Sequence, residues 1–361
     1  MPRNERPLTG ATKPVYLYVV TTISDVARAA GVSKTAVSFA LNGRGGIRED
    51  TRARILETAE QLGWVPSRPA RSLSVSRSFA VGLVIARDPE TLRADPFFPS
   101  FIAGIEAELS ERGLALMLQM VPGHARELDS YRRMVRERRV DGVFVTDLFV
   151  DDERPALLRE LGLPTVLVGP ALTGTGLPCV GVDDRPGIEA AVEHLVSLGH
   201  TRIAHVGGPR GMVHAQSRYE AWQHAVAGAG LQPDLYVESD FSARGGAAAT
   251  GQLLALEQPP TAIVFANDLM ALAGVSVATA RGVSVPGDLS VTGYDDTEMA
   301  AYLQPTLTSV SSEVIAWGQA AARRLLEEID RRPISEISLP APQLVVRDST
   351  APPPRRRRRR P

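Results

Sequence analysis

The side chains most clearly spaced for chemistry lie near the N-terminus, in residues 34–41. The positions on or near the exposed face of this predicted helix are Lys34, Thr35, Ala36, Ser38 and Phe39. A lysine can donate hydrogen bonds to guanine O6 and N7 or to a phosphate, and a threonine can bond to a base edge. The pattern favours binding of double-stranded DNA. The alternative is a plain helical hairpin in an all-α domain.

Patterns for catalysis or for metal binding are weak. The glycines at 43–46 follow a predicted helix, and those at 207–211 lack the Lys-Ser/Thr pair of a phosphate-binding loop. The six histidines show no metal-ligand spacing with carboxylates, and no serine nucleophile motif stands out. We therefore expect no enzyme, no metal site and no cofactor. Cys179 is the single cysteine, which excludes an intrachain disulfide and favours a cytoplasmic chain.

Short-range signals predict the helices that position residues 34–41. Thr22 and Asp25 read as the ends of a capping box that opens a helix over 23–30. Gly31 then ends this helix, and Ser33 caps the next one. A turn of three to four residues with a glycine between two helices is typical of a helix-turn-helix. A third helix is expected over 49–62.

From Phe79 onward, short apolar runs alternate with amphipathic helical segments. The runs are uniformly apolar, as strands buried on both faces are; they are 81–85, 114–118, 142–145, 165–168, 203–206, 262–265 and 289–292. Repeated strand–helix units predict an α/β fold with a doubly wound parallel sheet. About 270 residues are long for one such sheet, so we expect a body of two lobes.

The net charge of −1 conceals a strong segregation. Residues 1–79 carry 12 Lys or Arg and 6 Asp or Glu, the end of the chain carries six adjacent arginines, and residues 80–350 carry 22 basic and 35 acidic side chains. A basic N-terminal segment followed by an acidic body indicates that the N-terminal segment binds a polyanion. No apolar run approaches the length of a membrane helix, so no membrane partner is expected.

The residues from Thr22 onward, TISDVARAAGVSKTAVSFAL followed by Asn42, resemble the DNA-binding head of the lac-repressor (LacI/GalR) family. The resemblance continues in order to about residue 347. It is carried by Trp64, Pro66, Ala70-Arg71-Ser72-Leu73, Asp95-Pro96-Phe97-Phe98, Gly199-His200, Gly207-Gly208-Pro209, Ala266-Asn267-Asp268 and Gly293-Tyr294-Asp295-Asp296. One departure is Phe39, which stands where the family often has an arginine.

The resemblance implies site residues by position. It adds Thr22 and Asn42 to the DNA contacts, and it implies that Leu73 wedges into the minor groove at the operator centre, with Ala70 and Arg71 lining the same groove. It implies effector contacts from two lobes, namely Phe97, Phe98, His214, Arg218, Phe241, Asn267 and Asp295. Alternatives remain: Arg218 and Asp295 could form an internal ion pair, one of the two phenylalanines could belong to the core, and Asp268 could cap a helix.

The resemblance also implies the domain order. We expect a disordered leader over 1–21, a helix-turn-helix head over 22–66, a hinge over 67–78, a body over 79–348 with a periplasmic-binding-protein-like fold of type I, and a disordered Pro/Arg tail over 349–361. The expected N-lobe is about 79–179 with 309–340, and the expected C-lobe is about 180–308 with 341–348.

The implied function is that of a homodimeric transcriptional regulator, cytoplasmic and nucleoid-associated. We expect it to repress genes of carbohydrate uptake or catabolism by binding a pseudo-palindromic operator, with an affinity that a sugar-like effector changes. The rival hypothesis is a solute- or sugar-binding protein without regulatory DNA binding.

Overall fold

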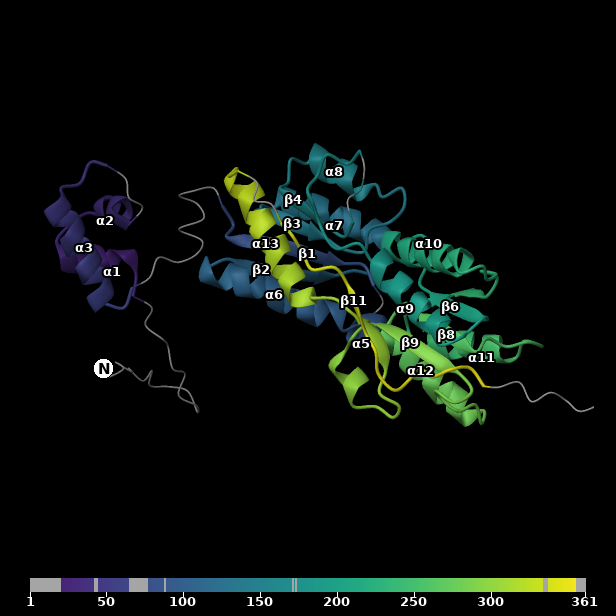
Figure 1. The fold of residues 1–361 in the computed structure, drawn as a ribbon. Helices are drawn as coiled ribbons and strands as arrows, with labels where there is room; N and C mark the ends of the chain where they lie inside the picture. Colours follow the sequence, from purple (N-terminus) through teal and green to yellow (C-terminus); the bar gives the residue numbers. More distant parts are fainter. Residues whose placement is uncertain are drawn as a thin grey trace, which may run out of the picture. The chain divides into compact units, whose positions relative to one another are not determined.

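The computed structural model describes residues 21–41, 45–64, 77–87, 89–170, 172, 174–333 and 337–354. The chain divides into two compact units, residues 1–78 and 79–361 (Figure 1). Several predicted features lie outside the described residues: the leader, Asn42, the hinge residues Ala70, Arg71 and Leu73, and the arginines 355–360.

The head consists of α1 (Ile23–Ala30), α2 (Lys34–Leu41) and α3 (Glu49–Gln61). The capping box is confirmed, since the Asp25 carboxylate accepts hydrogen bonds from the N–H and the hydroxyl of Thr22 at 3.0 and 2.7 Å. The Ser33 hydroxyl accepts from the Ala36 N–H at 3.1 Å, and Gly31 takes a left-handed φ of 64° between the two helices. The three helices meet over a small core that includes Val26, Val37 and Ile55. The local signals in the sequence therefore form the predicted helix-turn-helix.

The first lobe of the body is a five-stranded parallel sheet in the order β2-β1-β3-β4-β5. Its strands are β1 (Ala80–Ile85), β2 (Ala115–Met120), β3 (Gly142–Val145), β4 (Thr165–Val168) and β5 (Cys179–Val180). Its helices are α5 (Pro89–Ala94), α6 (Phe97–Glu111), α7 (His124–Arg136), α8 (Arg154–Glu160) and α13 (Val314–Asp330). Separate hydrophobic cores lie on the two faces of the sheet, one with α6 and α13 and the other with α7 and α8.

The second lobe is a six-stranded sheet in the order β11-β10-β9-β8-β6-β7, parallel except for β11. Its strands are β6 (Ile203–Gly207), β7 (Tyr236–Glu238), β8 (Ala262–Phe265), β9 (Ser290–Asp295), β10 (Thr308–Ser311) and β11 (Gln343–Val345). Its helices are α9 (Arg185–Ser197), α10 (Val213–Gly228), α11 (Ala243–Leu254), α12 (Asp268–Ala280) and the short 3-10 helix η1 (Glu298–Ala301). Two cores again cover the two faces, so the doubly wound α/β architecture is confirmed.

The chain crosses between the lobes at points that differ from the expected ones. Residues 309–311 were expected in the N-lobe, but β10 pairs with β9 and β11 in the second sheet. The following helix α13 returns to the first lobe and packs on α6 (Figure 1). The close packing of these helices depends on Gly104, where a Cβ atom would lie 2.2 Å from the carbonyl oxygen of Ile315.

Two other expectations about the body need correction. The strand β2 is not buried on both faces, because it is the edge of its sheet, and Leu118 and Met120 are 45% and 57% exposed. Residues 349–351 were expected in a disordered tail, but Ser349 is fully buried and its hydroxyl donates to the Val291 carbonyl at 2.6 Å. The Ala351 N–H donates to the Ser290 hydroxyl at 3.0 Å, so this segment closes the end of the second lobe.

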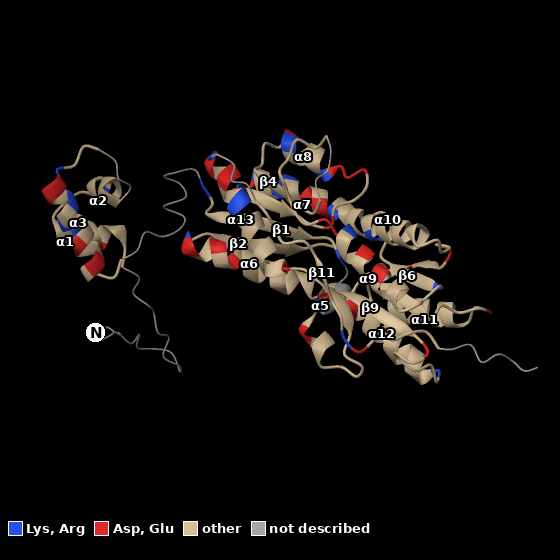
Figure 2. Cartoon of the chain, viewed as in Figure 1, with Lys and Arg blue, Asp and Glu red and all other residues tan. Residues whose placement is uncertain are grey.

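Charged side chains are excluded from the centres of both sheets. The strands β1, β3, β4, β6 and β8 contain no Lys, Arg, Asp or Glu, and they are tan throughout in Figure 2. The strand β9 has one, Asp295, as its last residue. Polar groups begin where the parallel strands end, and the carboxyl ends of parallel strands meet at one edge of a sheet. This edge is therefore where a ligand site is expected in each lobe.

Candidate functional site

A cavity of about 90 Å³ lies within the body, where the strand ends of the two lobes face each other. Cavities of this size hold several water molecules. The first lobe contributes Arg87, Asp95, Phe97, Thr146, Asp147 and Trp317, among others. The second lobe contributes Asp184, His214, Arg218, Phe241, Asn267 and Asp295, among others.

Six of the seven expected effector contacts line this cavity. They are Phe97, His214, Arg218, Phe241, Asn267 and Asp295. Phe98 is the exception, because its side chain is 1% exposed and lies in the core beneath α6. Successive residues of a helix point about 100° apart, so the two adjacent rings cannot both face the cavity.

Arg218 is held by groups of its own lobe. Its Nε donates to Asp184 Oδ2 at 3.1 Å, its Nη1 donates to the Ala266 carbonyl at 2.5 Å, and its guanidinium lies 3.6 Å from the centre of the Tyr294 ring. The Tyr294 hydroxyl donates to the other Asp184 oxygen at 2.7 Å. Burial lowers the pKa of Arg218, but Asp184 raises it further, so the guanidinium stays charged. The alternative of an Arg218–Asp295 ion pair is wrong, since Asp184 is the partner.

Arg87 forms a second clamped cation on the first lobe. Its Nε and Nη2 bind both oxygens of Asp147 at 2.6 and 2.5 Å, and its Nη1 donates to Asp95. Burial raises the pKa of Asp147, but the adjacent Arg87 lowers it more strongly. Arg87, Asp147 and Asp184 were not expected in the site. Arg87 and Asp147 each lie shortly after a predicted strand, and Asp184 directly precedes α9.

Asp295 differs from the other carboxylates of the cavity, because no hydrogen bond or ion pair holds it among the described residues. Burial raises its pKa well above the usual range. Its backbone φ is 108°, and the cavity residues Asp147 and Phe241 also have left-handed φ values of 51° and 64°. Such values cost about 1–3 kcal/mol each in residues other than glycine and cluster at functional sites.

Asn267 is another residue of the second lobe that lines the cavity. The Asn267 Oδ1 accepts from the Met270 N–H at 2.9 Å and thus caps α12, while its Nδ2 donates to the Phe241 carbonyl at 3.0 Å. Asp268 was the expected cap, but it accepts from Thr297 and Ser309 instead.

The aromatic rings of the cavity come from both lobes. The Phe241 ring stacks on His214 with their centres 5.2 Å apart, and burial lowers the pKa of His214 to about 4. On the first lobe Phe97 packs edge-on against Trp317 at 5.5 Å, and the Trp317 Nε1 donates to the Val180 carbonyl at 2.7 Å. The cavity therefore presents apolar ring surfaces beside its carboxylates.

The cavity is lined by more acidic than basic side chains. Four aspartates line it, namely Asp95, Asp147, Asp184 and Asp295, against the two clamped guanidiniums. Carboxylates accept hydrogen bonds, so the site suits a ligand with several hydroxyl donors. Among the described residues no group of His, Cys, Asp and Glu is arranged to hold a metal ion.

The predicted DNA contacts of the head lie as expected along α2. Lys34 and Thr35 are exposed at its first turn, while Ala36, Ser38 and Phe39 are half-buried. Thr22 is exposed at the start of α1, whereas Val37 and Ala40 of α2 are buried. The exposed N-terminal turn of the second helix is the part that enters the major groove in helix-turn-helix proteins.

Within the described residues no helix is long and apolar enough to span a membrane.

Comparison with known families gives two matches along the chain. Residues 22–67 match the model described as bacterial regulatory proteins, lacI family, and residues 192–350 match a periplasmic binding protein-like domain. The HTH-type transcriptional regulator CelR of Thermobifida fusca is 34% identical over 339 residues, which cover 91% of this chain and 98% of that protein.

Solved structures agree with these matches. The lac repressor dimer bound to operator and the anti-inducer ONPF aligns with a TM-score of 0.80 and 28% identity, covering 92% of this chain and 99% of that chain. A complex of the regulator CelR with cellobiose aligns with a TM-score of 0.68 and 32% identity, covering 91% and 99%. These likenesses extend through both the head and the body.

Proposed function

Because the chain belongs to the lacI family of bacterial regulatory proteins, we propose that it represses genes of carbohydrate uptake or catabolism. As a member of that family it is a DNA-binding transcriptional regulator and not an enzyme. It acts in the cytoplasm, on the DNA of the nucleoid. The lac repressor structure with operator supports a pseudo-palindromic operator as its DNA partner.

The effector in this proposal is an uncharged sugar. The observation that carries this choice is the partnerless carboxylate of Asp295 in a cavity whose two guanidiniums already have acidic partners. A sugar hydroxyl can donate to Asp295, and the rings of Phe97 and Phe241 can cover the C–H face of a sugar. A phosphate or carboxylate group would instead meet an excess of negative charge. The related regulator CelR in complex with cellobiose supports the same class of ligand.

The proposed mechanism is linkage between the cavity and the head. A ligand that binds one arrangement of the two lobes better than another shifts the population toward it, and operator affinity changes by the same coupling free energy. In this proposal the sugar favours the arrangement that binds the operator less tightly.

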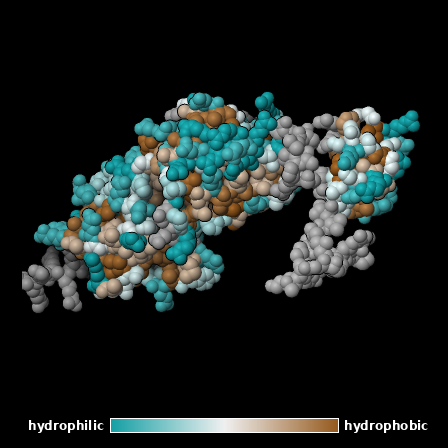
Figure 3. Space-filling model, turned by 180° about the vertical axis from the view of Figure 1, so that it is seen from behind, coloured by the Kyte–Doolittle hydropathy of each residue, from teal (hydrophilic) through white to brown (hydrophobic). Residues whose placement is uncertain are grey.

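The proposed assembly is a homodimer, since one helix-turn-helix covers a single half-site. The lac repressor structure to which the chain is similar is a dimer on its operator. Exposed apolar residues support a subunit contact: Leu118 and Met120 on the edge strand β2, and Ile315 on α13 with 53% exposure. Figure 3 shows hydrophobic areas among the hydrophilic residues on one face of the body.

The decisive experiment measures operator affinity with and without candidate ligands. Operator DNA is first enriched from a random duplex pool on the full chain. The affinity is then measured by fluorescence anisotropy with uncharged mono- and disaccharides, their phosphate esters and uronic acids. We expect an uncharged sugar to weaken operator binding. A phosphate ester or uronic acid that acts more strongly than the parent sugar would overturn the proposed ligand class. A reporter gene behind the enriched operator separates repression from activation.

The role of Asp295 is tested by Asp295→Ala, because an asparagine would keep a side-chain acceptor for the sugar hydroxyl. Removal of one partner of a buried hydrogen bond costs about 1–3 kcal/mol, so sugar affinity should fall by roughly 5- to 150-fold. Asp234→Ala is the matched control, because Asp234 is exposed and outside the cavity. Equal sugar affinities of the two variants would remove Asp295 from the ligand contacts.

A further inference from the structure

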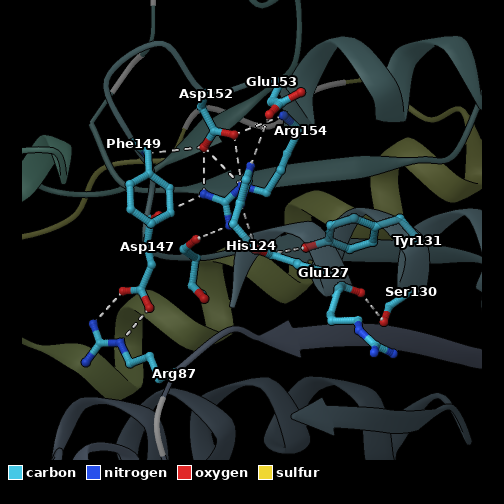
Figure 4. A network of polar contacts seen from close by, with 12 residues as sticks. Arg87, His124, Glu127, Ser130, Tyr131, Asp147, Phe149, Asp152, Glu153 and Arg154 are labelled. Atoms are coloured by element: carbon cyan, nitrogen blue, oxygen red, sulfur yellow. Dashed lines mark hydrogen bonds and ion pairs between the residues drawn. The ribbon is translucent and has the colours of Figure 1, made fainter. Parts of the chain in front are cut away.

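A buried ionic cluster beneath the cavity has no role in the function proposed above. Arg154, Glu127 and Asp152 have side chains that are only 1–2% exposed (Figure 4). The Arg154 Nη1 donates to Glu127 Oε1 at 2.7 Å, and its Nη2 donates to Asp152 Oδ2 at 2.6 Å. The Tyr131 hydroxyl donates to the same Glu127 oxygen at 2.9 Å.

Arg154 also bonds to the backbone that leaves β3. Its Nη1 donates to the Thr146 carbonyl at 3.0 Å, and its Nη2 donates to the Asp147 carbonyl at 2.7 Å. The Asp152 carboxylate accepts from the Phe149 N–H at 3.2 Å, and the Phe149 ring lies over the guanidinium at 5.2 Å. Residues 146–152, called the β3–α8 segment here, are thus held from within the first lobe.

The outer side of the β3–α8 segment bonds to the second lobe. The Val213 N–H donates to the Leu148 carbonyl at 2.8 Å, and the Val150 N–H donates to the Gly211 carbonyl at 2.9 Å. Val213 begins α10, the helix that carries His214 and Arg218 into the cavity. The segment also lines the cavity itself through Thr146, Asp147 and Leu148.

The segment therefore has three sets of partners: the ionic cluster, the cavity and the second lobe. Its backbone at Asp147 has a left-handed φ of 51°, a conformation that needs outside support in a residue other than glycine. Arg154 supplies that support, because its guanidinium donates hydrogen bonds to the carbonyls of Thr146 and Asp147, which flank the Asp147 Cα atom. Buried ion pairs seldom add net stability compared with apolar packing, so a structural role alone does not explain the cluster.

We propose that Arg154, with Glu127 and Asp152, is a positioning group that holds residues 146–152 in the shape that both lines the cavity and hydrogen-bonds to the second lobe. Through this group a ligand in the cavity is coupled to the arrangement of the lobes. The inference rests on the proposed function, since it takes the cavity as the effector site.

The test compares two neighbouring aspartates with the same change of charge. Asp152→Asn weakens the cluster, whereas Asp151→Asn alters an exposed side chain outside it. Hydrogen–deuterium exchange of the full chain without ligand is the first measurement. We expect the Val150 and Val213 amides to exchange at least tenfold faster in D152N than in D151N. Equal exchange in the two folded variants overturns the proposal.

The second measurement uses the sugar identified by the operator assay. We expect D152N to lose at least tenfold in the sugar's effect on operator affinity, measured as the ratio of the affinities without and with the sugar. D151N should keep the wild-type response. A D152N response equal to that of D151N overturns the positioning role. If no sugar affects even the wild type, the proposed function fails, while the exchange experiment still decides the positioning role.

A wild-type experiment covers the case in which D152N does not fold. The sugar should then slow exchange at the Val150 and Val213 amides of the unaltered chain, since both amides bridge the lobes. Binding without any change at these two amides overturns the coupling.

Discussion

His205 should make the body lose stability in mild acid. This residue of β6 is fully buried; its Nδ1 lies 2.8 Å from the Val264 carbonyl, and its Nε2 has no hydrogen-bond partner among the described residues. The ring is therefore neutral, with the proton on Nδ1. Its neighbour Trp222 stacks at 5.7 Å. Burial lowers the pKa of His205 to about 4, although the bond to the Val264 carbonyl opposes the shift.

The magnitude follows from linkage. The pKa of an unfolded histidine is about 6.5, so the unfolded chain binds the proton more tightly than the folded chain does. Stability from this group is fully present above about pH 6.5 and is lost as the pH falls toward 4. The whole shift corresponds to roughly 3 kcal/mol, of which about 2 kcal/mol is lost by pH 5.

The assay is urea unfolding at pH 7.5 and pH 5, followed by tryptophan fluorescence. His205→Asn keeps a donor toward the Val264 carbonyl but cannot titrate. The pH-dependent change in the free energy of unfolding should therefore shrink by about 2 kcal/mol in this variant. Other titrating groups, such as His214, remain in both proteins and cancel in the comparison. His224→Asn alters an exposed side chain of the same lobe and should keep the wild-type pH dependence. An unchanged pH dependence in His205→Asn would exclude His205 as the source of the lost stability.

Two further predictions concern the packing of the first lobe and the head. Gly104→Ala places a Cβ 2.2 Å from the Ile315 carbonyl oxygen, so it should cost about 1–3 kcal/mol or more and lower the melting temperature, whereas Gly228→Ala has open space and should not. Lys34→Ala and Thr35→Ala should relax the base preference in selection from random duplexes, since a bidentate base contact is worth about 1–3 kcal/mol; unchanged selection would remove them from the contacts.

The sequence by itself determined the elements that depend on near neighbours in the chain. The Thr22–Asp25 capping box, the Gly31 turn and the Ser33 cap each act over three or four residues, so their residue types suffice to predict the head. The central strands were also predictable, because a strand covered on both faces needs an uninterrupted apolar run. The edge strand β2 was predicted with the wrong exposure, since its sequence resembles that of the central strands while its position in the sheet differs.

Part of the cavity could be predicted as well. The family resemblance implied six residues that line it, namely Phe97, His214, Arg218, Phe241, Asn267 and Asp295. Their roles could not be read in the same way: Asn267 caps a helix, and Arg218 is bound to Asp184 rather than to Asp295. A motif specifies which side chain occurs at a position. The hydrogen-bond partner of that side chain comes from another part of the chain, so the motif does not predict the partner.

The tertiary structure alone decided the features that join distant segments. It placed β10 in the second sheet, closed that lobe with Ser349 and Ala351, and brought Arg154 to Glu127, 27 positions earlier in the chain. Arg154 and Glu127 have no local signal for burial, because an Arg or Glu on an amphipathic helix usually faces solvent. Burial becomes favourable for such charges only when folding supplies oppositely charged partners and carbonyl groups at hydrogen-bonding distance, and that supply is a property of the folded chain.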